Sequence, residues 1–347
     1  MYISYITSDA YSPYCGISLT SLFENNKEME DLEVFIVTYD LKDDNKKKFD
    51  ILAEKYNRKL TFIDAMPVID DLKVKYKIKD FSGTSIGYTR IFPHKLYPEY
   101  VNKILYIDSD TIIISSLAGV EEFDLCGCPF AMAENLSFEI MPELLRDNEK
   151  IAFYNKGKNY NSGVIICDIQ KYLEAGIEGI LIEELKKGET YAYAEQSIIN
   201  CAVPFKFIKS LPLKYNYSLH RFSKYEIFDV IQYYGKIYSI EDMMDAEKEP
   251  IIIHYIGDRS RPWYRQAVTR RKKEYLDYKH ISPWCAMESK SIFETKYFRD
   301  LPVVNKIVQI ITIPLFNSRI LYMYHRYRDR KKYNNVNSKG EKTNIRR

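Results

Sequence analysis

Two aspartates separated by one residue, Asp108 and Asp110, directly follow a short apolar run that begins after Lys103. Four to five apolar residues bounded by polar ones predict a buried strand. An unpaired buried carboxylate is costly, so a carboxylate pair at a strand end points to a ligand. Carboxylate oxygens suit Mg²⁺ and Mn²⁺, and such a cation can hold a diphosphate. Because Asp also favours turns, a solvated strand-to-turn junction is the alternative, and these residues alone leave both open.

A histidine after a second apolar run, His254, could complete this site. A lone His in that position is more often structural. Together with Asp108 and Asp110, however, it would give Mn²⁺ two carboxylates and one imidazole, with positions open for phosphate oxygens. Arg259 and Arg261 in the following loop could place a guanidinium on the same diphosphate, or could be simple surface charge. The chain contains no Walker-type loop and no Gly-x-Gly-x-x-Gly, so a P-loop or dinucleotide fold lacks support.

The elements that must position these residues alternate between strand and helix. Strands are predicted at 3–7, 32–38, 59–63, 104–107, 129–133 and 161–167, with a short antiparallel addition at 112–114 and another apolar run at 251–257. Helices are predicted at 16–24 and 42–56, with a helix-rich stretch that ends near 201. This alternation predicts βαβ units, a mostly parallel sheet and helices on both faces. Asp108 and Asp110 then lie at a carboxyl strand end, where open α/β sheets bind ligands.

Composition predicts a globular protein of substantial size. The 347 residues are 46% hydrophobic and 29% charged. The six cysteines are scattered, which argues against a disulfide framework. No basic segment is followed by a long apolar one, and no run of apolar residues is long enough to span a bilayer. We therefore expect the protein in the reducing cytoplasm.

The C-terminal region is strongly basic, although the net charge of the chain is only +3. Residues 319–347 contain ten Lys or Arg and two acidic residues, a net +8, so residues 1–318 carry −5. Before this tail, residues 293–332 predict one or two amphipathic helices. The apolar stripe includes Phe298, Val304, Ile307, Ile311, Leu315 and Phe316. We expect this region to lie on an anionic membrane surface; the alternative is that the stripe packs on the catalytic domain and the tail is disordered.

Six short segments, in a fixed order along residues 1–265, together resemble one enzyme family. They are Thr7-Ser-Asp9-Ala-Tyr11, Tyr88-Thr-Arg90, Ile107-Asp-Ser-Asp110, Tyr160-Asn-Ser-Gly-Val-Ile165, Glu195-Gln196, and His254-Tyr-Ile-Gly257 with the following Arg261-Pro-Trp263. Each segment alone is weak, but six in order are specific. The chain resembles glycosyltransferase family 8, the retaining sugar-nucleotide transferases that include bacterial lipopolysaccharide galactosyltransferases and glycogenin.

This resemblance implies a GT-A type fold, a Rossmann-like mixed α/β sheet flanked by helices. It also implies transfer of galactose or glucose from a UDP-sugar with Mn²⁺, or Mg²⁺, as cofactor. The implied metal ligands are Asp108, Asp110 and His254. The implied nucleotide-binding residues are Asp9 and Tyr11 at the uracil, with Asp108, Ser109, Gly257 and Arg261. The implied catalytic residues are Arg90, Asn161 and Glu195 in contact with the donor sugar, and Gln196 beside the anomeric carbon.

Two departures from the family pattern affect these roles. Arg261 stands where the family has a phosphate-binding lysine, in a loop one residue longer, so either Arg259 or Arg261 could reach the diphosphate. Glu195 stands where Asp is common.

Gln196 carries an amide, which is a poor nucleophile. Same-face substitution, in which the leaving phosphate takes the acceptor's proton, therefore fits better than a covalent intermediate.

Two other functions compete with this interpretation. A haloacid-dehalogenase-type phosphatase would use Asp108 as nucleophile, but its Asp-x-Asp usually opens the domain, and Asp242 and Asp245 lie in an acidic stretch without strand character. A catalytically inactive, membrane-bound sugar-nucleotide binding module would not need the intact metal ligands.

We predict a catalytic domain at 1–265, a helical basic segment at 266–332 and a disordered tail at 333–347. The predicted partners are a UDP-sugar, a glycan or lipid-linked acceptor and the inner face of the cell membrane, and no nucleic acid.

Overall fold

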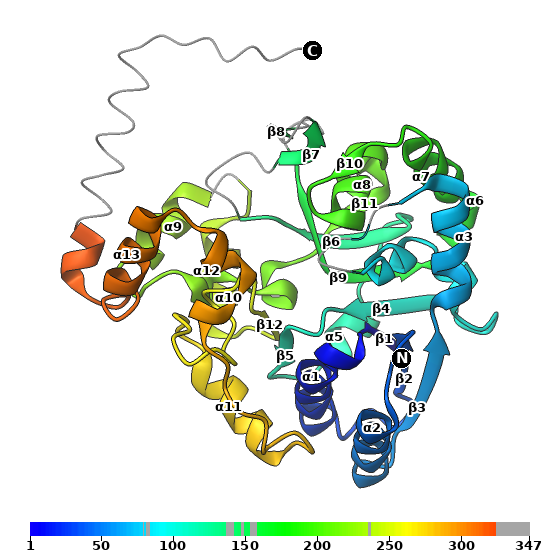
Figure 1. Cartoon of the computed structure of the whole chain (residues 1–347). Helices are drawn as coiled ribbons and strands as arrows, with labels where there is room; N and C mark the ends of the chain where they lie inside the picture. The colour runs from blue at the N-terminus through cyan, green and yellow to red at the C-terminus, as the bar shows by residue number, and fades with distance from the viewer. Residues whose placement is uncertain are drawn as a thin grey trace. The chain divides into compact units, whose positions relative to one another are not determined.

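A computed structural model of the chain describes residues 1–78, 80, 84–136, 142–146, 149–152, 158–234 and 237–323 (Figure 1). The chain divides into two compact units, and each is described by itself. Unit 1 comprises Met1–Ser218, Tyr234–Tyr255 and Lys273–Met287. Unit 2 comprises Leu219–Tyr233, Ile256–Lys272 and Glu288–Arg347, of which the last is described to residue 323. The domain boundary at residue 265 stays a prediction.

A seven-stranded mixed sheet forms the centre of unit 1, in the order β11–β6–β9–β4–β1–β2–β3 (Figure 1). Its strands are β1 (Tyr2–Ile6), β2 (Glu33–Thr38), β3 (Lys59–Asp64), β4 (Lys103–Ile107), β6 (Phe130–Glu134), β9 (Tyr160–Asp168) and β11 (Ile208–Ser210). β1 pairs parallel with β2 and β4, whereas β9 runs antiparallel between β4 and β6. The four strands predicted before residue 108 are confirmed to within one residue at each end.

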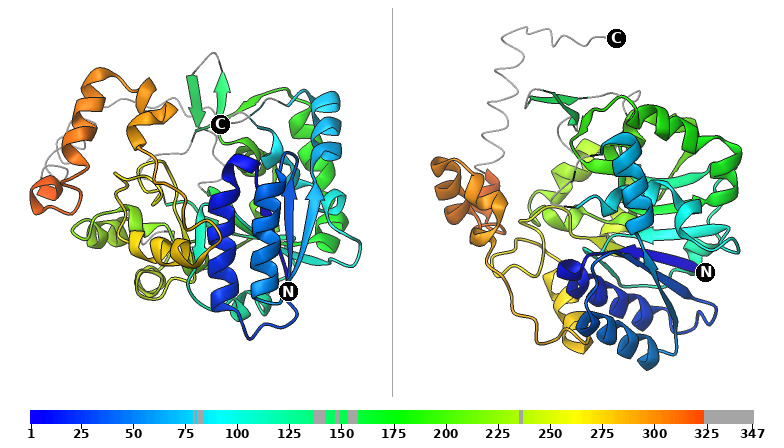
Figure 2. Two further views of the ribbon diagram at one scale, coloured as in Figure 1. Left: turned by 60° about the horizontal axis from the view of Figure 1, so that its bottom comes forward. Right: turned by 45° about the vertical axis from the view of Figure 1, so that its right-hand side comes forward.

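Helices cover both faces of this sheet because side chains of successive strand residues point to opposite sides. In β4, Leu105 and Ile107 belong to one buried cluster, whereas Ile104 and Tyr106 belong to the other. The first cluster includes residues of α1 (Ser12–Asn25), α2 (Asp43–Lys55) and α5 (Ala118–Glu121). The second includes residues of α3 (Met66–Tyr76), α4 (Pro93–Leu96), α6 (Ile169–Glu174), α7 (Ile177–Leu185) and α8 (Ala194–Ala202). Figures 1 and 2 show α1 and α2 side by side on their face.

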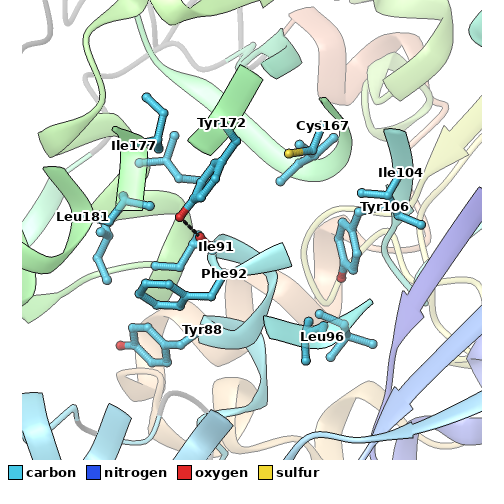
Figure 3. Close-up of a cluster of buried hydrophobic side chains, with 14 of the residues drawn as sticks. Tyr88, Ile91, Phe92, Leu96, Ile104, Tyr106, Cys167, Tyr172, Ile177 and Leu181 are labelled. Atoms are coloured by element: carbon cyan, nitrogen blue, oxygen red, sulfur yellow. Dashed lines mark hydrogen bonds between the residues drawn. The ribbon is translucent and has the colours of Figure 1, made fainter. Parts of the chain in front are cut away.

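The second cluster also fixes a 3₁₀ helix, η2 (Ile86–Ile91), that carries a polar residue of the site (Figure 3). Tyr88 and Ile91 of η2 are buried beside Phe92. The hydroxyl of Tyr172 on α6 donates a hydrogen bond of 2.7 Å to the carbonyl oxygen of Ile91. Since η2 is anchored on both sides of Arg90, the backbone of that residue is held in place.

A tryptophan near the end of unit 1 packs against the first helix. A Cβ at Gly16 of α1 would lie 1.9 Å from the ring of Trp284, so only glycine leaves room for the indole. The Trp284 ring meets Phe49 edge-on, and its Nε1 donates to Asn45 Oδ1 at 3.0 Å. The segment that holds α11 (Lys272–Ile281) thereby closes on the N-terminal helices.

Two small sheets and one further α-helix also belong to the described part of unit 1. β5 (Thr111–Ile113) pairs antiparallel with β12 (Ile252–His254), as predicted for a short antiparallel strand after the aspartates. β10 (Thr190–Tyr191), β7 (Pro142–Arg146) and β8 (Glu149–Ala152) form the other small sheet. The further helix is α10 (Ile240–Lys248), preceded in sequence by the 3₁₀ helix η4 (Leu213–Asn216).

Unit 2 contains α9 (Ile227–Tyr234), α12 (Lys296–Asp300) and α13 (Val303–Thr312). Part of the predicted apolar stripe is exposed on α13: Val304 is 70% and Ile311 is 57% accessible to solvent. Phe298, which also belongs to the predicted stripe, is instead buried, and its ring contacts Phe293. Residues 324–347, which hold most of the predicted basic tail, lie outside the described residues. Among the described helices, none combines the length and apolar character needed to cross a bilayer.

Candidate active site

The two aspartates occupy the tight connection between β4 and β5. The backbone N–H of Asp108 donates to the carbonyl oxygen of Gly163 on β9 at 2.8 Å, and the hydroxyl of Thr111 donates to the carbonyl oxygen of Asp108 at 2.8 Å. Asp110 is buried, whereas Asp108 is partly exposed. Two strand ends and a turn therefore hold both carboxylates at the carboxyl edge of the sheet, where the sequence predicted them.

The pairing of β5 with β12 brings His254 to these carboxylates. His254 lies opposite Thr111 in the register, and the N–H of Tyr255 donates to the carbonyl oxygen of Asp110 at 2.8 Å. Nε2 of His254 lies 3.2 Å from Oδ1 of Asp110 and 3.7 Å from Oδ2 of Asp108. One possible ligand atom from each of the three residues lies within 4.8 Å of the others. Two carboxylates and one imidazole form a donor set that fits Mn²⁺.

Arg90 links this group to the start of α8. Its Nη1 lies 3.2 Å from Asp108 Oδ1 and 3.1 Å from Glu195 Oε1, and it donates to the carbonyl oxygen of Ser162 at 3.2 Å. The guanidinium lies 4.1 Å from the centre of the Tyr106 ring. Burial lowers the pKa of Arg90, but the carboxylates of Glu195 and Asp108 raise it above its ordinary value. Arg90 is therefore a permanent buried cation between two carboxylates.

Glu195 and Gln196 are buried at the first turn of α8. The hydroxyl of Ser162 donates to Glu195 Oε1 at 3.1 Å. Burial raises the pKa of the Glu195 carboxyl above its ordinary value, and the charge of Arg90 opposes that rise. Oε1 of Gln196 accepts 3.2 Å hydrogen bonds from the N–H of Ser162 and from Nδ2 of Asn161. The pair is thus part of a buried polar cluster and not of a solvated helix face.

Asn161 owes its position to an irregularity in β9. The pairing of β6 with β9 shifts between Met132 and Ala133, so that Ala133 lies opposite Asn161. Asn161 Oδ1 accepts from the N–H of Gly163 at 2.9 Å. A Cβ at Gly163 would lie 2.1 Å from Cε1 of His254, so a glycine is required for the imidazole to reach the aspartates.

Replacing Gly163 by alanine should therefore weaken divalent-cation binding. The added methyl group forces the His254 ring away, and displaced ligand support typically costs about 10- to 100-fold in metal affinity. Titration of Mn²⁺ in the presence of UDP, followed by the electron paramagnetic resonance signal of free Mn²⁺, measures the change. Gly179→Ala in α7 is the matched control, because a Cβ there meets nothing within 4 Å. Equal Mn²⁺ affinity in both variants would contradict this steric argument.

The residues predicted at the uracil lie after β1, the neighbour of β4. Asp9 Oδ1 accepts from the N–H of Lys42 at 3.0 Å and from Asn45 Nδ2 at 2.9 Å. Burial raises the pKa of Asp9, but these two hydrogen bonds lower it below its ordinary value. The ring of Tyr11 contacts Tyr14 edge-on, and the hydroxyl of Ser109 donates to the carbonyl oxygen of Ile6 at 3.2 Å. Asp9 is consequently held as a carboxylate.

Gly257 and Arg261 belong to unit 2, so the structure gives no distance from them to the aspartates. Gly257 has φ of +83°, in the left-handed region that favours glycine. Arg261 Nη1 forms an ion pair of 2.7 Å with Asp258, and the guanidinium lies 5.7 Å from the Trp263 ring centre. The contact of this loop with a diphosphate stays a prediction.

Two residues that support the site were not predicted from sequence. Tyr106 donates its hydroxyl hydrogen to Asp108 Oδ1, and burial raises the pKa of this hydroxyl well above its ordinary value. Strand alternation could have identified it, because residues two apart share one side of β4. The second residue, Asn216, connects His254 with Asn161. No motif in the sequence marks it.

Comparison with known proteins identifies related sequences and folds. The family described as "Glycosyl transferase family 8" matches residues 2–267. Lipopolysaccharide 1,2-glucosyltransferase of Escherichia coli (strain K12) is 26% identical over 305 residues, which cover 85% of this chain and 82% of that protein. General stress protein A of Bacillus subtilis (strain 168) is 20% identical over 296 residues, covering 84% and 97%. The crystal structure of galactosyltransferase LgtC with donor and acceptor sugar analogues superposes with a TM-score of 0.63 at 15% identity, covering 82% and 96%. At 15% identity, the similarity to LgtC shows only that the two chains share the GT-A fold.

Proposed function

Because the chain belongs to glycosyl transferase family 8 and is a hexosyltransferase, we propose that it moves galactose or glucose from a UDP-sugar to a glycan or a lipid-linked oligosaccharide. The reaction retains the configuration of the sugar and serves the synthesis of cell-surface polysaccharide. The names of the E. coli glucosyltransferase and of LgtC support the two donor sugars. Membership of glycosyl transferase family 8 leaves the phosphatase alternative without support. Asp242, which that alternative would need at a metal, instead lies in the first turn of α10 and accepts a hydrogen bond from the preceding Ser239.

The observation that carries this proposal is the convergence of Asp108, Asp110 and His254 at one sheet edge. The donor set fits Mn²⁺, with Mg²⁺ as the second choice. When bound there, Mn²⁺ would neutralise the charge that develops on the departing diphosphate. Arg90 and Tyr106 hold the Asp108 carboxylate by an ion pair and a hydrogen bond, so that one ligand is oriented before the donor binds.

The buried cluster beside the metal ligands is proposed to hold the donor sugar. Arg90, Asn161 and Glu195 offer a cation, an amide and a carboxylate to sugar hydroxyls. Oε1 of Gln196 already accepts two hydrogen bonds from Ser162 and Asn161, which reduces its basicity and makes it a poor nucleophile. Its amide can steady positive charge at the anomeric carbon through its dipole. A same-face substitution, with the acceptor proton passing to the leaving phosphate, is therefore the mechanism we propose.

The nucleotide part of the donor is assigned to the neighbouring strand ends. Asp9 and Tyr11 follow β1 and are proposed to hold the uracil, while Ser109 lies between the two metal-binding aspartates. Gly257 and Arg261 are proposed to contact the diphosphate, with Arg259 as the alternative cation. A planar guanidinium can bind phosphate oxygens in pairs, which suits this role.

The C-terminal region is proposed to bind an anionic membrane surface from the cytoplasmic side. In support, α13 exposes Val303, Val304, Ile307 and Ile311, and residues 319–347 carry a net charge of +8. When such a region lies among anionic headgroups, its apolar face is removed from water and its basic residues lie close to negative charge. A lipid-linked acceptor would then be presented at the same surface.

Substitution of two exposed isoleucines, Ile307→Ser with Ile311→Ser, should release the protein from anionic vesicles. Burial of one such side chain contributes about 1.5–3 kcal/mol, so vesicle partitioning should fall at least about tenfold. Co-sedimentation with phosphatidylglycerol-containing vesicles at low salt measures it. Val74→Ser on α3 is the control, since Val74 is 80% exposed in unit 1. If the unaltered protein ignores these vesicles, the membrane assignment fails and the transferase proposal is unaffected.

The test of the catalytic proposal is UDP release from a panel of UDP-sugars with Mn²⁺ and without acceptor. A glycosyltransferase releases UDP from its own donor by slow hydrolysis, and removal of Mn²⁺ with EDTA stops the release. Release of inorganic phosphate would indicate a phosphatase. Binding of UDP-sugars without any release, also in the presence of candidate acceptors, would indicate an inactive binding module.

A further inference from the structure

Asn216 is a buried amide that lies between the metal-binding histidine and the donor-sugar cluster. It ends η4, and the backbone that follows runs beside β12: the N–H of Tyr217 donates to Ile252 at 2.8 Å, and the N–H of His254 donates to Tyr217 at 2.9 Å. These two backbone hydrogen bonds fix the distance between Asn216 and His254. The side chain of Asn216 is therefore placed by the sheet and not by a mobile loop.

A chain of hydrogen bonds sets the orientation of this amide. The backbone N–H of Gly163 can only donate, so the atom of Asn161 that it meets at 2.9 Å is the side-chain oxygen. The same oxygen lies 2.8 Å from Nδ2 of Asn216, which must donate to it. Oδ1 of Asn216 consequently faces His254 Nδ1 at 2.8 Å and accepts its hydrogen.

This orientation determines which nitrogen of His254 is free to bind a cation. With the hydrogen on Nδ1 held by Asn216, the lone pair of the neutral imidazole is on Nε2, the atom 3.2 Å from Asp110 Oδ1. A metal-binding histidine commonly donates its other ring hydrogen to an oxygen that fixes the tautomer and the ring orientation. Asn216 has the geometry of such a partner.

We propose that Asn216 is a positioning residue that holds His254 in the metal-binding tautomer and, through the same amide, orients Asn161 beside Gln196. The inference rests on the proposed metal-dependent function. One side chain then aligns both parts of the proposed active site, which are the diphosphate site at His254 and the site of the anomeric carbon at Gln196. Asn216 itself need not touch the donor.

The experiment measures Mn²⁺ affinity in the presence of UDP for four variants of the full chain. Asn216→Ala, and Asn216→Leu with the same number and branching of side-chain heavy atoms, remove the acceptor, and we expect about 10- to 100-fold weaker Mn²⁺ binding. Asn216→Asp keeps an oxygen that can accept the Nδ1 hydrogen, so it should restore most of the Mn²⁺ affinity, although its carboxylate cannot donate to Asn161. The matched control is Asn26→Ala, because Asn26 is as buried as Asn216 and its amide likewise accepts one hydrogen bond and donates one. It accepts from the backbone N–H of Leu117 at 2.7 Å and donates to the carbonyl oxygen of Leu22 at 2.9 Å.

Asn26→Ala should lower the melting temperature without changing Mn²⁺ affinity, which separates positioning from general loss of stability. The Mn²⁺ concentration for half-maximal UDP-sugar hydrolysis should rise in Asn216→Ala by the same factor as the dissociation constant. Wild-type affinity in Asn216→Ala and Asn216→Leu, or equal weakening in Asn216→Asp, would overturn the inference while the proposed function stands. A wild-type protein that bound neither Mn²⁺ nor Mg²⁺ would overturn both the inference and the proposed metal dependence.

Discussion

Asp110→Asn should abolish glycosyl transfer while the fold is retained. The substitution replaces a carboxylate that lies 3.2 Å from Nε2 of His254 by a neutral amide of the same shape. A metal ion that stabilises charge in the transition state contributes several kcal/mol, and about 4 kcal/mol corresponds to about 10³-fold in rate. The fold is retained because the backbone oxygen of Asp110, which accepts from the N–H of Tyr255, is unchanged.

UDP release at saturating donor and Mn²⁺ measures this effect, and a thermal melt checks the fold. Asp70→Asn serves as the control, because Asp70 is an exposed carboxylate on α3. EDTA treatment of the wild-type enzyme should reproduce the loss. Retention of more than about a tenth of the activity by Asp110→Asn, or turnover of the wild type in EDTA, is incompatible with the expected metal contribution.

Gln196→Ala should lower kcat by about 10²-fold with little change in KM for the UDP-sugar. The amide of Gln196 is held by Ser162 and Asn161, so its dipole has a fixed direction before the donor binds. Loss of one preoriented group of this kind costs about 10²–10³-fold in kcat. An interaction made mainly in the transition state changes kcat and leaves ground-state binding nearly unaltered.

Steady-state kinetics and UDP-sugar binding by calorimetry separate the two effects. Gln170→Ala on α6 is the control, since Gln170 is exposed and donates only to Glu174 among the contacts described. If binding and kcat fell by equal factors, Gln196 would be a donor-binding residue. A covalent sugar trapped on Glu195 would overturn the same-face mechanism.

The strand ends could be predicted from sequence because buried strands are apolar and stop at polar residues. Asp108, Asp110 and His254 each follow such a run, and the carboxyl edge of an α/β sheet is where such residues meet. The order of the motifs predicted the family, which the family match confirms, and with it the roles of Arg90, Asn161 and the pair Glu195-Gln196, which stay predictions. These predictions depended on local patterns or on motif order, which a single sequence contains.

The remaining features depend on pairings between distant residues. The irregular register of β6 and β9, the approach of Gly163 to His254 and the bridging amide of Asn216 all require the strand neighbours to be known. A single sequence does not show whether an asparagine is buried or exposed. Exposure of the stripe on α13 was likewise open, because helical periodicity does not state what covers the apolar face.

The proposed metal ligands are synthesised at very different times, because Asp108 and Asp110 immediately precede β5 whereas His254 ends β12. β5 and β12 pair only after nearly the whole of unit 1 has been synthesised, and Trp284 must still close on α1. Domains fold from their N-terminal parts as the ribosome delivers them. A nascent or truncated chain therefore presents two aspartates without their histidine and has no complete cation site. On the proposed metal-dependent function, a chain that ends before β12 therefore cannot use a UDP-sugar, because it lacks His254.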